Sequence, residues 1–201
     1  IKNWKTFGRI FLSIKTQLYF VLARREIQIK QITGILFGMV GTENQKFIPE
    51  RRKLFMNREE LKNLMIQWRH ELHAYPECAF EEVHTADFVA KKLQEMGISV
   101  ETGIGKTGVV GTLKAGTGNR IIGLRADMDC ICLQESSNIS YKSKIPNRMH
   151  ACGHDGHTAT LLGAAKVLAE TKDFSGTVRF VFQPAEEPGR GSKAMIEDGF
   201  F

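Results

Sequence analysis

The sequence has little cysteine and no long apolar run. Its 4 cysteines among 201 residues are too few for a disulfide scaffold, and no two are spaced as C-x-x-C, so we expect a reducing compartment and a cytoplasmic location. The longest uncharged apolar stretch near the start, residues 18–23, is far shorter than the roughly 20 residues of a membrane span. We therefore expect no membrane partner. The composition, with 42% hydrophobic and 25% charged residues, excludes collagen-like, low-complexity and wholly disordered chains.

Positive charge is concentrated in the first quarter of the chain. Residues 1–55 hold 11 Lys and Arg against 3 Asp and Glu, whereas residues 56–201 hold 17 against 19. Such a segment fits a targeting or membrane-surface arm, a nucleic-acid arm, or an extension that lies outside the fold. Its basic residues are scattered rather than clustered, which favours the third interpretation and predicts no nucleic-acid partner. We predict a basic extension over residues 1–55 and a folded region over residues 56–201.

The folded region alternates between helical and strand patterns. Asn57 with Glu60 three residues later is a variant of a helix-start pattern, and Pro76 ends that helix. A strand, a long helix and a second strand near the C-terminus form a βαβ unit, which implies parallel strands and an α/β fold. The expected elements after the first helix are a helix over residues 82–96, strands over 98–102, 108–114 and 120–127, a helix over 157–170 and a strand over 177–183.

Polar side chains collect where these elements end. Asp127 and Asp129 follow one strand of the βαβ unit, Glu186 and Glu187 follow the other, and the run His-Ala-Cys-Gly-His-Asp-Gly-His over residues 150–157 precedes the helix. Ligands of open parallel sheets bind beyond the carboxyl ends of the strands. We therefore expect carboxylates, a thiol and imidazoles at one edge of the sheet.

These side-chain types suit a metal-dependent hydrolase. Thiolate, imidazole nitrogen and carboxylate oxygen are the protein ligands of Zn²⁺. Cys152 and His154, two residues apart in an extended loop, would point the same way. Glu186 and Glu187 in extended backbone would point apart, so that one binds metal and the other holds a water whose pKa the metal lowers.

Each of these residues also has an ordinary structural interpretation. A pair of glutamates is more often a solvated surface, and a single buried cysteine is more often a core residue. Asp127 or Asp129 would orient an imidazole, and His157 at a helix start would support the site or simply cap or pack. We expect the remaining side chains of these types to be ordinary core thiols (Cys130, Cys132), a thiol with no partner in reach (Cys78), and surface or structural histidines (His70, His73, His84).

Four segments together resemble a known family of hydrolases. They are Trp-Arg-His-Glu-Leu-His-Ala-Tyr-Pro-Glu over residues 68–77, Arg-Ala-Asp-Met-Asp over 125–129, the run from Lys144 to Ala159, and Phe-Gln-Pro-Ala-Glu-Glu over 182–187. In order and spacing, residues 56–201 are similar to the metal-dependent amidohydrolases of the hippurate hydrolase, N-acyl-amino-acid hydrolase and auxin-conjugate hydrolase type. The Met-His-Ala-Cys-Gly-His-Asp-Gly-His segment is the most specific part of this resemblance.

The resemblance implies a dinuclear metal site and a reaction. Cys152, His154 and Glu187 would be ligands of two divalent ions per subunit, with the cysteine bridging them. The ions would be Zn²⁺ or Mn²⁺, with Co²⁺ as a third candidate. Glu186 would be the general base. The substrates would be N-acyl amino acids, cleaved to an amino acid and a free acid. The family's parallel or mixed-sheet catalytic domain carries an inserted lid domain that also mediates homodimer formation.

The chain departs from that family in length. Family members are about twice as long, and their remaining ligand histidines lie downstream of the Glu-Glu pair, whereas no histidine follows Glu187 here. The resemblance therefore implies a catalytic domain truncated before the lid. Two alternatives follow: a non-catalytic fragment that lacks the downstream ligands, and, with weaker support, a hydrolase with Cys152 as nucleophile. Residues 130–132 are Cys-Ile-Cys where the family has Ala-Leu-Pro.

Overall fold

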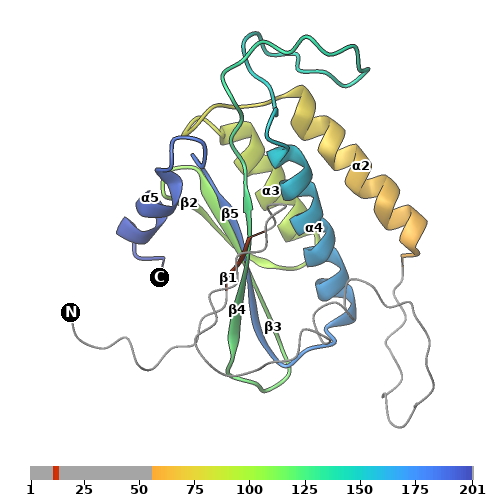
Figure 1. Ribbon diagram of the computed structural model, residues 1–201. Helices are drawn as coiled ribbons and strands as arrows, with labels where there is room; N and C mark the ends of the chain where they lie inside the picture. The colour runs from red at the N-terminus through yellow and green to blue at the C-terminus, as the bar shows by residue number, and fades with distance from the viewer. Residues whose placement is uncertain (1–10, 14–55, 201) are drawn as a thin grey trace, which may run out of the picture.

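A mixed β-sheet with helices on both faces forms the core of the molecule (Figure 1). The computed structural model describes residues 11–13 and 56–200. The sheet has the strand order β1-β4-β5-β3-β2. Its strands are β1 (Phe11–Ser13), β2 (Ser99–Ile104), β3 (Gly108–Ala115), β4 (Ile121–Asp127) and β5 (Gly176–Gln183). The helices are α2 (Arg58–Ala74), α3 (Val83–Glu95), α4 (His154–Thr171) and α5 (Gly191–Glu197).

The centre of the sheet is a parallel pair of strands. β4 and β5 are parallel neighbours joined through α4, with Asp127 opposite Gln183 at their carboxyl ends. This arrangement confirms the βαβ unit and the α/β class expected from the sequence. β3 pairs antiparallel with β5, and β2 pairs antiparallel with β3, so the sheet as a whole is mixed. β1 pairs parallel with the outer edge of β4.

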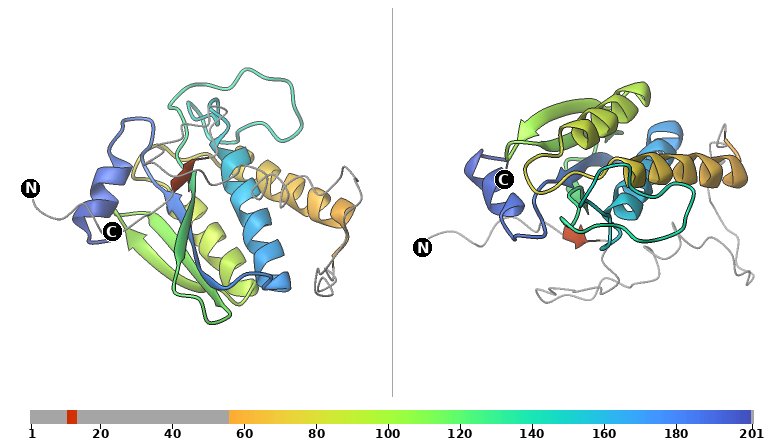
Figure 2. Two further views of the ribbon diagram at one scale, coloured as in Figure 1. Left: turned by 60° about the horizontal axis from the view of Figure 1, so that its bottom comes forward. Right: turned by 90° about the horizontal axis from the view of Figure 1, so that it is seen from above.

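Successive buried side chains of β5 belong to two separate hydrophobic clusters, one on each face of the sheet. Phe180 and Phe182 of β5 join the main core beneath α3 and α4, whereas Val181 between them packs with Met195 of α5. Successive side chains of a strand point to opposite faces, so α5 covers the face opposite to α3 and α4. Figure 2 shows the two layers of helices on either side of the sheet.

Helix α2 packs against α4 rather than directly on the sheet. The two helices approach closely at Gly163 of α4, where a Cβ atom would lie 2.6 Å from the sulfur of the Met65 side chain of α2 and would displace the end of that flexible side chain. α2 begins with the expected capping box, in which the Asn57 side chain accepts from the Glu60 N–H and the Glu60 carboxylate accepts from the Asn57 N–H. Among the described helices, none is long and apolar enough to cross a membrane.

The structure moves the start of one expected helix and adds a further helix. α4 begins at His154, three residues earlier than expected, which places His154 and His157 on the first turn of the helix. α5 was not expected, because seven residues are too few to show a helical period. Most of the expected N-terminal extension lies outside the described residues. Its boundary at residue 55 stays a prediction, and Phe11–Ser13 is its only described part.

Candidate metal centre

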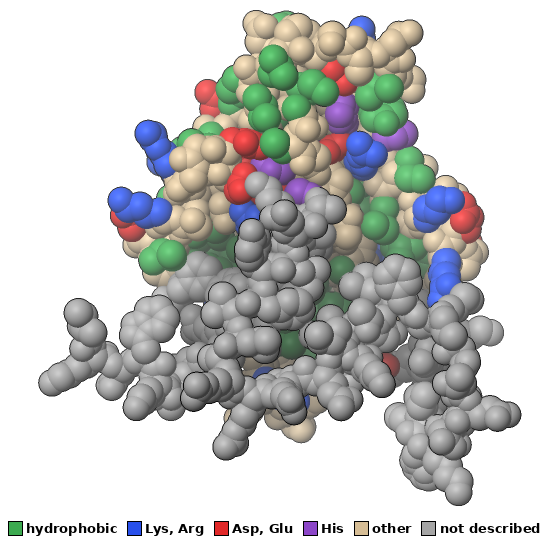
Figure 3. Space-filling model, in the orientation of Figure 1, with side chains coloured by type: hydrophobic (Ala, Val, Ile, Leu, Met, Phe, Trp, Pro, Cys, Tyr) green, Lys and Arg blue, Asp and Glu red, His purple; other side chains and the backbone are tan. Residues whose placement is uncertain are grey.

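Three segments converge beyond the carboxyl ends of β4 and β5. Asp127 and Asp129 come from the end of β4, His154 comes from the start of α4, and Glu186 and Glu187 come from the turn that follows β5. Figure 3 shows acidic and histidine side chains gathered beside one another on this face of the molecule. The location agrees with the expectation for an open parallel sheet.

His154 lies at the centre of this cluster, fully buried, with one ring nitrogen lacking a hydrogen bond. Its Nδ1–H donates to the backbone carbonyl of Asp129 at 2.7 Å. The other nitrogen, Nε2, has no hydrogen-bond partner within the described part of the chain. Three carboxylate oxygens face this nitrogen, from Asp127 at 3.6 Å, Glu186 at 3.7 Å and Glu187 at 3.4 Å. A buried imidazole nitrogen that has no hydrogen bond and faces three carboxylate oxygens is an arrangement that a cation would satisfy.

Two overlapping sets of ligand-type atoms surround this nitrogen. Atoms of Cys152, His154 and Glu187 lie within 4.8 Å of one another, and the same holds for Asp127, His154 and His157. The first set combines thiol, imidazole and carboxylate, the three ligand types of Zn²⁺. The residues present therefore fit a divalent metal ion, which Cys152, His154 and Glu187 would hold.

Asp127 is anchored on both of its oxygens. Its Oδ1 accepts a hydrogen bond from Nδ1 of His157 at 2.7 Å, and its Oδ2 pairs with Arg125 at 2.9 Å. Burial raises the pKa of Asp127, but the hydrogen bond from His157 and the charges of His154 and Arg125 outweigh it and lower the pKa to about 2. Asp127 is therefore ionised, and its hydrogen bond with His157 fixes the orientation of this carboxylate.

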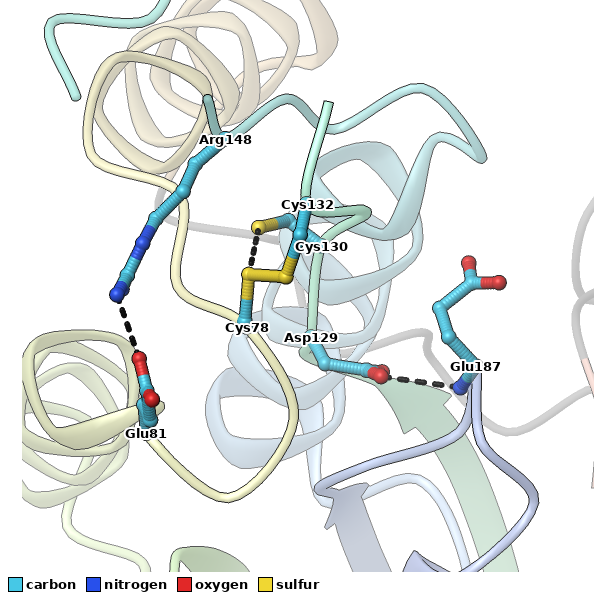
Figure 4. The surroundings of a disulfide bond; sticks show 7 residues. All are labelled: Cys78, Glu81, Asp129, Cys130, Cys132, Arg148 and Glu187. Carbon is cyan, nitrogen blue, oxygen red and sulfur yellow. Dashed lines mark hydrogen bonds and ion pairs between the residues drawn. A yellow bond between two sulfur atoms is a disulfide. The ribbon is translucent and has the colours of Figure 1, made fainter. Parts of the chain in front are cut away.

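Asp129 ties the two sides of the site together. Its carboxylate accepts hydrogen bonds from the backbone N–H groups of Glu186 and Glu187, each at 3.0 Å, while its carbonyl accepts from His154. Figure 4 shows the hydrogen bond between Asp129 and Glu187. Burial raises the pKa of Asp129, but the hydrogen bonds from His154 and from the two N–H groups lower it overall. Burial lowers the pKa of His154, and its contacts with Asp129 and Asp127 raise it overall. The negative charge around the imidazole thus exceeds the effect of burial.

Two geometric expectations were wrong. Cys152 and His154 do not lie in an extended loop, because Cys152 is in a turn and His154 already begins α4. The carboxylates of Glu186 and Glu187 do not point apart, because their backbone forms a turn and both lie within 3.7 Å of His154 Nε2. Convergence is achieved here by turns, which let neighbouring residues project to the same side.

A buried polar network below the site was missed at the sequence level. The ring of His73 bridges two carboxylates, with Nδ1 at 2.8 Å from Asp155 and Nε2 at 3.1 Å from Glu135. His150 lies nearby, and neither of its ring nitrogens has a hydrogen-bond partner among the described residues. Burial lowers the pKa of His150 to about 4. Asp155 and His150 lie within the run of residues 150–157, but no sequence pattern predicts that they lie close to Glu135.

The cysteines at the edge of the site behave differently from the expectation. Cys78 was expected to have no partner, and Cys132 to be an ordinary thiol, but the two form a disulfide between the loop after α2 and the segment after β4 (Figure 4). Cys130 is a buried thiol, as expected, and its sulfur lies 4.0 Å from that of Cys78. The disulfide is three residues from Asp129, so it braces the segment that carries this aspartate.

Comparison with known proteins finds relatives that are named as hydrolases. Residues 123–201 match the family model of peptidase family M20/M25/M40. Hippurate hydrolase of Campylobacter jejuni is 59% identical over 133 residues, which are 66% of this chain and 34% of that protein. N-acyl-L-amino acid amidohydrolase of Geobacillus stearothermophilus is 44% identical over 154 residues, covering 72% of this chain and 41% of that protein.

A solved structure supports the same assignment. The YXEP protein of Bacillus subtilis, described as a dinuclear metal binding peptidase from the M20 family, superposes with a TM-score of 0.68 at 38% identity, covering 71% of this chain and 40% of that one. Residues 123–201 are therefore similar to the M20/M25/M40 peptidase family in sequence, and the chain is similar to a member of the M20 family in fold. The chain spans between about a third and two fifths of the length of the relatives it matches.

Proposed function

We propose that this chain supplies part of the active site of a metal-dependent amidohydrolase that cleaves the amide bond of N-acyl amino acids. The observation that carries the proposal is the convergence of Cys152, His154 and Glu187 within 4.8 Å around a buried imidazole nitrogen without a hydrogen bond. The similarity to hippurate hydrolase and N-acyl-L-amino acid amidohydrolase supports the substrate class.

The roles of the residues follow from their places. Cys152, His154 and Glu187 would hold a divalent ion, and a metal ion bound there would make hydroxide available at neutral pH by lowering the pKa of a bound water. Glu186 has a side chain 24% exposed and lies beside His154, so it can reach both water and substrate. As general base it takes the proton of the attacking water and passes it to the leaving amine nitrogen as the C–N bond breaks.

The proposal extends to the cofactors and partners of the protein. It includes two divalent ions per subunit (Zn²⁺ or Mn²⁺, with Co²⁺ as a third candidate), a homodimer for the full-length parent, and a cytoplasmic location. The thiolate favours Zn²⁺ among these ions, since soft ligands select it over Mn²⁺. Asp127, Asp129 and His157 support the site without binding the reacting groups.

The first prediction concerns Glu186. With Zn²⁺, Mn²⁺ or Co²⁺ added to the full-length parent, we expect release of the amino acid from N-benzoylglycine or N-acetyl amino acids, measured by amine detection. Glu186→Gln removes the base and should lower the rate by about 100-fold or more, while metal content measured by atomic emission stays unchanged. Hydrolysis that survives exhaustive chelation, or an unaffected Glu186→Gln variant, would contradict the proposal.

The two alternatives, a non-catalytic fragment and a cysteine nucleophile, predict different experimental results. If the 201-residue chain binds metal but does not hydrolyse these substrates, the result supports the non-catalytic fragment, because the family resemblance places further ligands downstream of Glu187. A cysteine nucleophile at Cys152 would react with iodoacetamide equally with and without metal. A metal ligand should react only after the metal is stripped, so alkylation of Cys152 mapped by mass spectrometry separates the two mechanisms.

A further inference from the structure

Three successive backbone N–H groups of the turn after β5 are bound by two buried carboxylates. The N–H groups of Glu186 and Glu187 donate to Asp129, and the N–H of Ala185 donates to Oε1 of Glu82 at 2.8 Å. Both carboxylates are fully buried. The turn that carries the proposed base and the proposed metal ligand is thus fixed from two sides.

Glu82 reaches this turn from a distant part of the chain. It lies 103 residues before Ala185 and directly precedes α3. Its second oxygen, Oε2, accepts from the Thr107 hydroxyl at 2.5 Å, so the carboxylate has a partner on each side. Burial raises the pKa of Glu82, and the hydrogen bonds from Thr107 and Ala185 oppose that shift. A carboxylate buried in this way is retained only where its hydrogen bonds are well made.

Ala185 is the point at which the turn changes direction. Its φ of +44° lies in the left-handed region that a non-glycine residue rarely adopts, at a cost of about 1 kcal/mol or more. Its carbonyl accepts from the N–H groups of Arg190 and Gly191, which closes the turn. The hydrogen bond from Ala185 to Glu82 therefore stabilises the conformation that sends the Glu186 and Glu187 side chains toward His154.

We propose that Glu82 is a positioning residue for the metal centre, which holds Ala185 and thereby sets the approach of Glu186 and Glu187 to His154. The inference rests on the proposed function in that the positioned groups are the proposed base and ligand. Within the described part of the chain, the carboxylate of Glu82 has hydrogen bonds to Thr107 and Ala185 and none to His154, Glu186 or Glu187. Residues that orient metal ligands from outside commonly change metal affinity by 10–100-fold when replaced.

The chain offers a matched control for this role. Glu77 lies in the same loop as Glu82, and its carboxylate also binds backbone, namely the N–H groups of His84 and Thr85 at the start of α3. Among the described residues, the carboxylate of Glu77 has hydrogen bonds to His84 and Thr85 and none to the turn at residues 184–190. Loss of Glu77 should therefore disturb the loop as much as loss of Glu82, but not the placement of Glu186 and Glu187.

Two measurements on the full 201-residue chain test the inference. The first is amide hydrogen exchange without metal: Glu82→Ala should speed exchange at Ala185, Glu186 and Glu187 by tenfold or more relative to wild type, whereas Glu77→Ala should not. The second is Co²⁺ titration followed by its absorption bands. Glu82→Ala should weaken Co²⁺ binding by about tenfold or more, and Glu77→Ala should leave it within about twofold.

Glu82→Gln serves as the conservative variant, because its amide oxygen can still accept from Ala185, and it should restore affinity to near the wild-type value. Circular dichroism establishes that each variant is folded. Unchanged exchange or unchanged Co²⁺ affinity in folded Glu82→Ala would overturn the inference, as would equal losses in Glu82→Ala and Glu77→Ala. If wild type binds no Co²⁺, the proposed function fails, and the exchange result alone decides whether Glu82 holds the turn.

Discussion

At the scale of single residues, the site is defined by what surrounds His154 Nε2. The Asp129 carbonyl fixes the proton on Nδ1, and three carboxylates face the other nitrogen. Residue types and strand ends were enough to predict which side chains would meet, because ligand sites of parallel sheets lie at the carboxyl ends of strands. The sequence did not predict Glu82, since its hydrogen bond to Ala185 spans 103 residues and has no local pattern.

His150 gives a pH-dependent prediction at this scale. Its pKa in the fold is about 4, below the unfolded value of about 6.5, because its ring is buried. At a pH between these two pKa values, the unfolded chain binds more protons than the folded chain. The free energy of unfolding therefore falls as the pH falls. Between pH 7.5 and 5 we expect a loss of about 2 kcal/mol from this residue.

Urea unfolding with chelator present, at both pH values, measures this loss. His150→Leu replaces the titrating ring with an apolar side chain that does not titrate. The free energy of unfolding of this variant should therefore fall by about 2 kcal/mol less than that of wild type over the same pH change. An identical pH dependence in both proteins would show that His150 is not held neutral by the fold.

At the scale of elements, helices and strands were predicted correctly where a helical or alternating pattern extends over many residues. The prediction failed for a short helix and for a helix start without a recognisable cap. α2 was located by its capping box, and β5 by its alternating residues. α4 starts earlier than expected because its N-cap is Gly153 in a left-handed conformation, without the side-chain cap that marks most helix starts. The disulfide was missed because 54 residues separate Cys78 from Cys132, and only the folded arrangement brings them together.

The Cys78–Cys132 disulfide gives a prediction about the free energy of unfolding. It closes a loop of 54 residues, for which the chain-entropy estimate is a stabilisation of about 4 kcal/mol. We expect Cys132→Ser to lower the free energy of unfolding by up to that amount, measured by urea denaturation. Dithiothreitol should lower the wild-type value similarly and leave Cys132→Ser unchanged.

Cys130→Ser is the control, since Cys130 neighbours the disulfide without forming it. This variant should keep its sensitivity to dithiothreitol. A wild-type chain whose stability is the same with and without reductant would contradict a stabilising Cys78–Cys132 bond.

At the scale of the whole molecule, the βαβ unit explains why the site lies where it does. β4, α4 and β5 bring Asp127, His154 and Glu187 to one edge of the sheet, and this topology was predictable from the order of strand and helix patterns. The direction of the side chains was not predictable, because it depends on the turns at residues 152 and 184–190. The central claim is that Cys152, His154 and Glu187 bind one divalent ion together.

X-ray absorption spectroscopy of the chain loaded with one equivalent of Zn²⁺ tests this claim most directly. We predict one sulfur ligand at about 2.3 Å with nitrogen and oxygen ligands at about 2.0–2.2 Å, and loss of the sulfur ligand in Cys152→Ser. A zinc shell without sulfur in wild type, or an identical shell in Cys152→Ser, would contradict the account.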